Sequence, residues 1–129
     1  MIFIHGSVPS SKNSKQVVRS GRFTRVIWSK AALKYVEESK QEWIDNKQVF
    51  LELINQQLPP YKIGFHFVRG TKHKYDFVGP LETCQDLMTR YEWLSDDNIT
   101  IIIPFPLSIN GVYTSYNKET PGVYINLIQ

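Results

Sequence analysis

The sequence has few of the features that mark secreted, membrane or nucleotide-binding proteins. Its single cysteine, Cys84, excludes an internal disulfide and a cysteine-rich zinc site. No apolar run approaches the roughly 20 residues that span a bilayer, and the apolar start 1–4 is shorter than the core of a signal peptide, about 7–15 residues. Because it also lacks a glycine-rich phosphate loop, we expect no nucleotide cofactor. These absences predict a soluble cytoplasmic protein without a membrane partner.

The composition is that of a folded domain. Hydrophobic residues make up 42% of the 129 residues and charged residues 21%, which excludes a disordered tail, a fibre and a coiled coil. A chain of this length can bury a real core, and it shows no internal repeat and no low-complexity segment. We therefore expect one domain that covers residues 1–129.

Charges of opposite sign are segregated along the chain. Residues 1–34 contain no acid, and residues 61–75 again contain basic residues but no acid. Residues 76–98 then carry six acids against one base, Arg90. Two basic stretches beside an acidic one favour a polyanionic partner with a divalent cation next to it. The alternative is that these are solvated faces whose charges mix again on folding.

The pattern of apolar residues predicts an α+β fold, a mixed sheet with helices packed on it. Strands are expected at 2–8, 22–28, 61–68, 99–105 and 122–128. Strict alternation in the third of these predicts a strand with one buried and one exposed face. The dipeptide Asn110-Gly111 predicts a tight turn.

Two helical stretches are expected between the strands. Ser29 is suited to cap the first, whose apolar stripe continues to Ile54, with a break at Asp45-Asn46 and an end at the prolines 59–60. The second begins at Gly79-Pro80, with Pro80 as its first residue, and ends near Trp93. Cys84 lies on its apolar stripe, so it is expected to be buried and unreactive.

The acidic stretch supplies the candidate catalytic residues. Asp76 precedes the second helix, Glu82 and Asp86 share one face of it, and the pair Asp96-Asp97 follows its end. A return of the chain beside the central strand would bring Asp97 back towards Asp76. Mg²⁺ prefers such oxygen ligands, and it can neutralise a phosphodiester during hydrolysis. Taken singly, each acid is equally explained as a turn or solvated helix residue.

The sequence opens with Gly6, Pro9, Ser10 and Asn13 in the spacing Gly-x-x-Pro-Ser-x-x-Asn. Three further segments are Lys74-Tyr75-Asp76-Phe77, Gln85-Asp86-Leu87-Met88 and Leu94-Ser95-Asp96-Asp97-Asn98. The order of these segments resembles RusA-type Holliday junction resolvases, in particular phage-borne members, and the last three segments are the most specific part of the resemblance. The similarity extends to about residue 105.

The resemblance implies a homodimeric endonuclease that resolves four-way DNA junctions with Mg²⁺ or Mn²⁺ in a bacterial or phage-infected cell. A two-fold dimer suits a junction that needs two paired cuts. The implied metal ligands are Asp76, Asp97 and Asp86, and Asp96 and Glu82 complete or support the catalytic set. The implied and charge-based DNA contacts are Lys12, Asn13, Lys15, Arg19, Arg22, Lys72 and Lys74.

The sequence departs from the family motif at three positions. The family's second Asp, its Asn and its Lys fall on Val78, Gly79 and Glu82. Either Glu82 or Asp86 supplies the missing carboxylate, or the chain retains the DNA-binding shape and has lost most of its activity. A third, weaker interpretation is a nuclease of relaxed specificity that acts on RNA or flaps.

Overall fold

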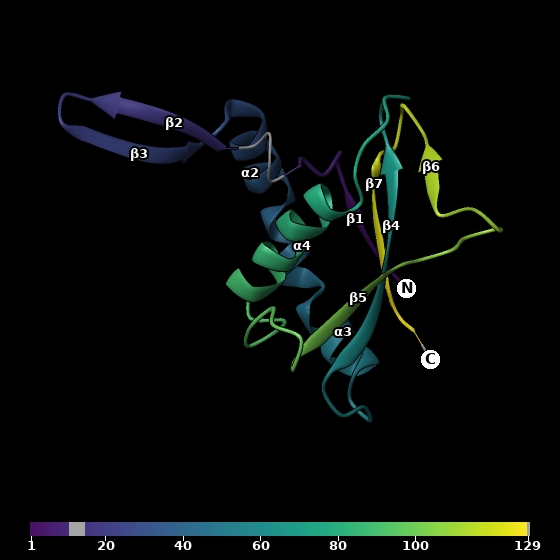
Figure 1. Cartoon of the computed structure of the whole chain (residues 1–129). Coiled ribbons are helices and arrows are strands. Elements are labelled where there is room, and N and C mark those ends of the chain that lie inside the picture. The colour runs from purple at the N-terminus through teal and green to yellow at the C-terminus, as the bar shows by residue number, and fades with distance from the viewer. Residues whose placement is uncertain (11–14, 129) are drawn as a thin grey trace.

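The structure is a computed structural model that describes the backbone of residues 1–10 and 15–128, and the side chains of these residues except 15–18, 20 and 23–28. Its elements are β1 (Ile2–His5), β2 (Lys15–Ser20), β3 (Phe23–Trp28), α2 (Lys30–Asp45), α3 (Lys47–Leu53), β4 (Tyr61–Arg69), α4 (Val78–Arg90), β5 (Ile102–Pro106), β6 (Thr114–Tyr116) and β7 (Gly122–Leu127). Figure 1 shows the helices on one side of the main sheet. The α+β class, a mixed sheet with helices packed on it, is confirmed.

The main sheet is built around β4. Its strand order is β1-β7-β4-β5, and β6 also pairs with β4. β7 is antiparallel to β4, whereas β5 runs parallel to its first half and β6 parallel to its last three residues. Along one edge of β4, therefore, β5 pairs with the first half of the strand and β6 takes its place at the end. The segment 107–113 between them projects from the sheet, as Figure 1 shows.

The prediction that one face of β4 is exposed is wrong, because residues 63–68 are all buried. A Cβ atom on Gly64 would lie 2.9 Å from Ile128 and 3.0 Å from Leu107, so these residues cover that face. His66 lies beside Gly64, and its Nδ1 donates to the Leu107 carbonyl over 2.8 Å while its Nε2 is 2.7 Å from the Ser115 hydroxyl. His66 thus joins the segment leaving β5 to the returning β6, a structural role.

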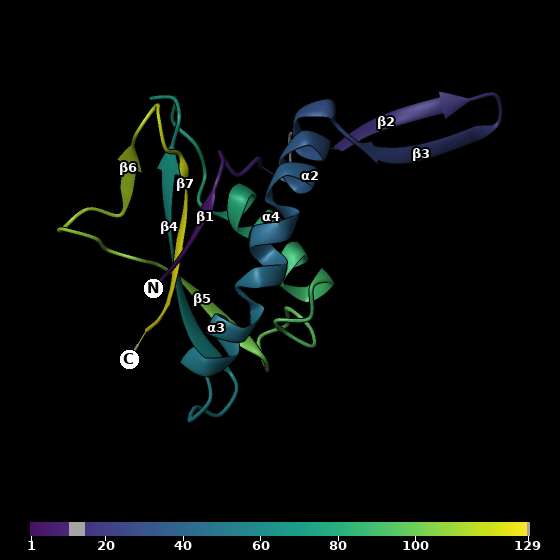
Figure 2. The same cartoon turned by 180° about the vertical axis from the view of Figure 1, so that it is seen from behind.

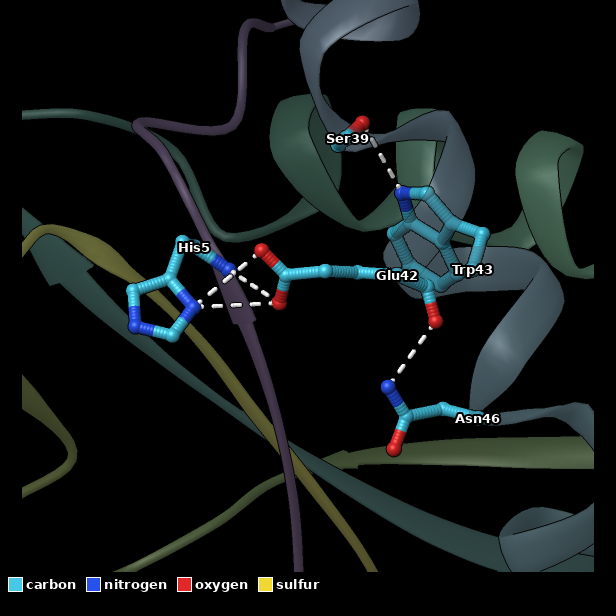
Figure 3. A network of polar contacts seen from close by, with 5 residues as sticks. All are labelled: His5, Ser39, Glu42, Trp43 and Asn46. Carbon is cyan, nitrogen blue, oxygen red and sulfur yellow. Dashed lines mark hydrogen bonds and ion pairs between the residues drawn. The ribbon is translucent and has the colours of Figure 1, made fainter.

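The first helical stretch forms as predicted. Ser29 caps α2, since its Oγ accepts a hydrogen bond from the Ala32 amide at 3.2 Å. α2 ends at Asp45. The side chain of the following residue, Asn46, donates to the Glu42 carbonyl, and α3 begins at Lys47. Figure 3 shows the same Glu42 holding β1, because its carboxylate lies 3.0 Å from the His5 ring and accepts the His5 amide. This contact joins α2 to the sheet.

The core lies between the sheet and the helices. Trp43 of α2 and Trp93, just beyond α4, are buried, and the Trp93 indole donates to the Trp43 carbonyl at 2.7 Å. The Trp93 ring also stacks on Phe50 with centroids 5.1 Å apart. Trp43 and Trp93 therefore belong to the core. The side chain of Trp28 lies outside the described residues.

Several of the expected elements differ from the structure: β1 ends at His5 and β5 covers Ile102–Pro106. α4 begins at Val78 and ends at Arg90, so Pro80 is its third residue; like Pro at the first position, it falls in the turn whose amides lack helical partners. A strand that was not expected, β2, pairs with β3 to form a separate hairpin. Short strand β6 was missed as well, because three residues carry no periodicity.

The β2–β3 hairpin forms an arm. Figures 1 and 2 show from opposite sides that it extends away from the rest of the molecule. Its two strands pair from Lys15↔Trp28 to Ser20↔Phe23, and Gly21 takes the positive φ of 61° that the turn requires. Within the described residues no helix has the length and apolar character needed to cross a membrane.

Candidate functional site

The segment that opens the sequence with the spacing Gly-x-x-Pro-Ser-x-x-Asn, here called the N-terminal motif, contacts the first turns of α4 through Pro9 and Ser10. The Thr83 hydroxyl donates to the Pro9 carbonyl at 2.7 Å. Gly79 faces Ser10 so closely that a Cβ atom there would overlap the Ser10 hydroxyl. Two segments about 70 residues apart in the sequence therefore meet here. The contact also gives a physical reason for glycine at position 79, where the family motif has Asn.

Arg69 supports the same region from the end of β4. Its Nη1 donates to the Val8 carbonyl at 3.1 Å, and its guanidinium lies 4.4 Å from the centre of the Tyr75 ring. Its Nε is buried and has no hydrogen-bond partner in the described part of the chain. Since the carbonyl and the ring are neutral, these contacts leave the positive charge of Arg69 uncompensated.

A basic cavity of about 500 Å³ opens beside Arg69. Lys72, His73 and Lys74 line it from the loop after β4, and Tyr116 and Ser115 line it from β6. The Lys72 ammonium lies 5.0 Å from the centre of the Tyr116 ring. No acid is among the lining residues, so this cavity, the basic cavity, favours an anion. The DNA contacts expected at Lys72 and Lys74 fall here, and both side chains are exposed.

A second cavity, of about 530 Å³, adjoins the first and is mostly apolar. Its walls are Tyr75 and Phe77 from the loop before α4, Phe105 and Pro106 from β5, and Tyr113 and Thr114 before and in β6. We call it the aromatic cavity. It lies where β6 replaces β5 along the edge of β4. No sequence pattern indicates this cavity, because only the pairing of β5 and β6 with one strand brings these residues together.

The expected acids are divided between the two ends of α4. Asp76 is exposed and lies two residues before the helix, between Tyr75 and Phe77. Glu82 and Asp86 are exposed on α4 itself, one turn apart. Asp96 and Asp97 are exposed beyond the other end of the helix.

The return of the chain beside the central strand does not bring Asp97 back to Asp76. β5 pairs with β4 in parallel, with Ile102 opposite Tyr61, so the chain re-enters the sheet at the beginning of β4. Asp76 follows the end of β4. At a rise of about 1.5 Å per residue, the 13 residues of α4 cover roughly 20 Å between the two sites. Figure 1 shows the loop after α4 at the opposite end of the helix from the loop before it.

The Asp96-Asp97 segment forms a local turn. The Asp96 carboxylate accepts the Asn98 side-chain amide and the Asp97 backbone amide, both at 2.8 Å. These hydrogen bonds, that of Asn98 foremost, hold the pKa of Asp96 below its ordinary value of 3.8. Asp96 therefore has a structural role in the turn, which was one of the two interpretations of this segment.

The fit to a metal is partial. Among the described residues, no group of three or more His, Cys, Asp or Glu side chains is placed to hold a metal ion. Mg²⁺ is commonly held by one or two carboxylates together with water and substrate phosphate. Asp76 and Asp97 each offer a single carboxylate, so a cation at either of them would need further ligands from substrate phosphate, water or another carboxylate.

The remaining predicted DNA contacts lie on or before the arm. Lys12 and Asn13 are outside the described residues, and of Lys15 only the backbone is described. Arg19 and Arg22 are exposed next to the turn of the hairpin. Between residues 15 and 28 the sequence has no acid, so the arm is positively charged along its length.

Cys84 is buried on the inner face of α4, as expected. Burial raises the pKa of its thiol, which keeps the sulfur protonated and unreactive. In comparisons of this chain with protein-family models, with curated proteins and with solved structures, no match was found.

Proposed function

We propose that this protein is a metal-dependent endonuclease that binds and resolves branched DNA, as the resemblance to RusA-type resolvases implies. The observation that carries the proposal is the arrangement of positive charge. The basic cavity and Pro9 of the N-terminal motif adjoin the region before α4 in which Asp76 lies, and the basic arm follows that motif in the sequence. We propose that this DNA cleavage takes place in the cytoplasm of a bacterial or phage-infected cell.

The arm supports DNA binding by its shape and charge. A two-stranded β-ribbon fits the major groove, and basic side chains bind phosphates by releasing counterions. Arg19 and Arg22, next to the turn, would contact the DNA backbone beside the branch. Lys72 and Lys74 would hold a further phosphate on the body of the protein.

Asp76 is our first choice for the metal-binding acid. Its neighbours Lys74 and Lys72 would place a phosphate close to it, and a cation there would neutralise the scissile phosphate and polarise a water molecule. Asp97, at the far end of α4, would complete the site only from a second protomer. A two-fold dimer with its two α4 helices antiparallel brings the beginning of one helix to the end of the other.

A second function, binding without cleavage, is favoured by the absence of a three-acid group among the described residues and by Val78 and Glu82. In that case the same positive surfaces would hold a junction, and the acids would be surface residues. Cleavage after restoration of the family pattern, Val78→Asp with Glu82→Lys, in an otherwise inert protein would establish this interpretation.

The deciding experiment incubates the protein with labelled four-way junction, duplex and single strand, each in Mg²⁺, Mn²⁺ or EDTA. We expect paired cuts in the junction with metal and none in EDTA. Asp76→Asn should lower cleavage at least about 100-fold, since a metal contributes several kcal/mol to the transition state. Junction binding in EDTA should persist.

The matched control is Asp45→Asn, an exposed acid at the end of α2 that lines neither cavity and lies outside the loop before α4. It should cut the junction at the wild-type rate. Undiminished cleavage by Asp76→Asn would contradict the assignment of Asp76. Salt-sensitive binding with no cleavage products in either metal would favour the second function.

A further inference from the structure

The two adjoining cavities suggest a ligand with an anionic part and a flat apolar part. They share Tyr75 and Thr114 as a common wall. On one side are Arg69, Lys72 and Lys74 without an acid, and on the other are aromatic rings and a proline. We infer that this composite groove binds an unpaired nucleotide, with its phosphate in the basic cavity and its base in the aromatic cavity.

The anionic part follows from Arg69. Its guanidinium is fixed by the Val8 carbonyl and the Tyr75 ring, both neutral, and its buried Nε has no partner in the described part of the chain. A phosphate reaching the basic cavity would meet this fixed cation and two lysines. A positioned guanidinium binds phosphate well because little freedom is lost when the contact forms.

The flat part follows from the aromatic residues. Tyr113 is 63% exposed and Phe105 37%, so both present the apolar surface of their rings to solvent. Both line the same cavity as Phe77. Aromatic rings that border a positive surface are the usual arrangement for stacking unpaired bases, and stacking does not depend on the base.

The Tyr75 ring is held rigidly between the two cavities. Its hydroxyl is 2.6 Å from the Thr114 hydroxyl, which in turn lies 3.3 Å from the Phe67 carbonyl. Phe67 also meets the ring edge-on, with centroids 6.3 Å apart. A wall fixed in this way would hold a base and its phosphate at a constant separation. Asp76 follows Tyr75 directly, so the bound nucleotide would lie beside the acid we propose for the metal.

This inference rests on the proposed DNA binding and narrows the substrate to DNA with an unpaired nucleotide at or near the branch. The test compares two labelled 12-nucleotide probes in EDTA by fluorescence anisotropy, an oligothymidine and an abasic strand of equal charge. The two probes carry the same number of phosphates, so phosphate contacts made by the arm should favour neither of them. We expect the oligothymidine to bind about tenfold tighter.

Two variants separate the halves of the groove. Tyr113→Ala should remove most of the preference for oligothymidine and leave the affinity for the abasic strand unchanged. Lys72→Ala should weaken the binding of both probes equally. It should also make the slope of the logarithm of the binding constant against the logarithm of the salt concentration shallower by about 0.7. Val112→Ala is the matched control, since Val112 is 49% exposed beside Tyr113 but lines neither cavity.

Equal binding of the two probes by the wild type would overturn the inference, as would equal weakening of both by Tyr113→Ala. Tighter binding of a 12-residue oligoglutamate than of oligothymidine would assign the groove to an acidic peptide instead. If the junction is still cut in any of these cases, only the inference fails. If no nucleic acid is bound or cut, the proposed function fails with it.

Discussion

The two ends of α4 carry acids of the same kind in different surroundings. Before the helix, Asp76 lies in a loop whose neighbours are cations and aromatic rings, and the N-terminal motif packs alongside at Gly79 and Thr83. After the helix, Trp93 anchors the chain in the core, and Asp96 uses its carboxylate to hold a turn.

The difference shows that an acid's surroundings, more than its position in a motif, indicate what it can do. Asp76 adjoins a cavity that attracts anions. A cation bound at Asp76 would therefore coordinate a phosphate that the basic side chains of the cavity also contact. Asp96 is engaged with Asn98, and its neighbour Asp97 lies at the same remote end. If both ends contribute to one site, two copies of the chain are needed.

The largest expected effect tests that requirement. Asp76→Asn and Asp97→Asn should each lower junction cleavage at least about 100-fold as homodimers. When the two variants are co-expressed with different tags and purified through both, each heterodimer retains one site with Asp76 from one protomer and Asp97 from the other. We expect it to nick the junction at about half the wild-type rate.

Heterodimers as inactive as their parents would show that Asp76 and Asp97 of different protomers do not combine in one site, and that each site is built within one chain. A heterodimer of Asp76→Asn with the wild type is the control. Under shared sites it too keeps one intact pair, so it should nick at the same rate as the mixed variants.

A smaller effect is expected where the N-terminal motif meets α4. Alanine normally stabilises a helix relative to glycine by about 1 kcal/mol, but at position 79 its methyl group would overlap Ser10. Gly79→Ala should therefore destabilise the protein by about 1–3 kcal/mol in urea unfolding and weaken junction binding by displacing the motif. The double variant with Ser10→Gly should recover most of the stability. A single variant more stable than the wild type would show that the motif does not pack here.

The smallest effect is expected in the turn after α4. Hydrogen bonds lower the pKa of Asp96, so the ionised carboxylate stabilises the turn at pH values above 3.8 and loses that effect as the pH falls through the lowered pKa. Asp96→Asn should lower Tm by about 1–2 °C at pH 7. The difference should shrink in acid, and junction binding should not change. A Tm difference that grows below pH 4 would contradict this role.

Much of the local structure was predictable from the sequence. The Ser29 cap, the break at Asn46 and the buried stripe with Cys84 depend on neighbours within a few positions. The same holds for the Asn110-Gly111 turn, in which both residues adopt positive φ. The sequence indicated which acids are candidates but not which of them lie close together. Spacing along the chain does not tell at which end of a sheet a returning strand enters it.

The sequence by itself determined the helices, most of the strands, the α+β class and the separation of basic from acidic segments, since these depend on local propensity and on charge order. Tertiary structure decided the burial of both faces of β4, the remote position of Asp97 and the joining of the two cavities. Those features depend on how β5, β6 and the C-terminal residues pair with one strand. Pairings between distant segments leave no periodic pattern in either segment alone.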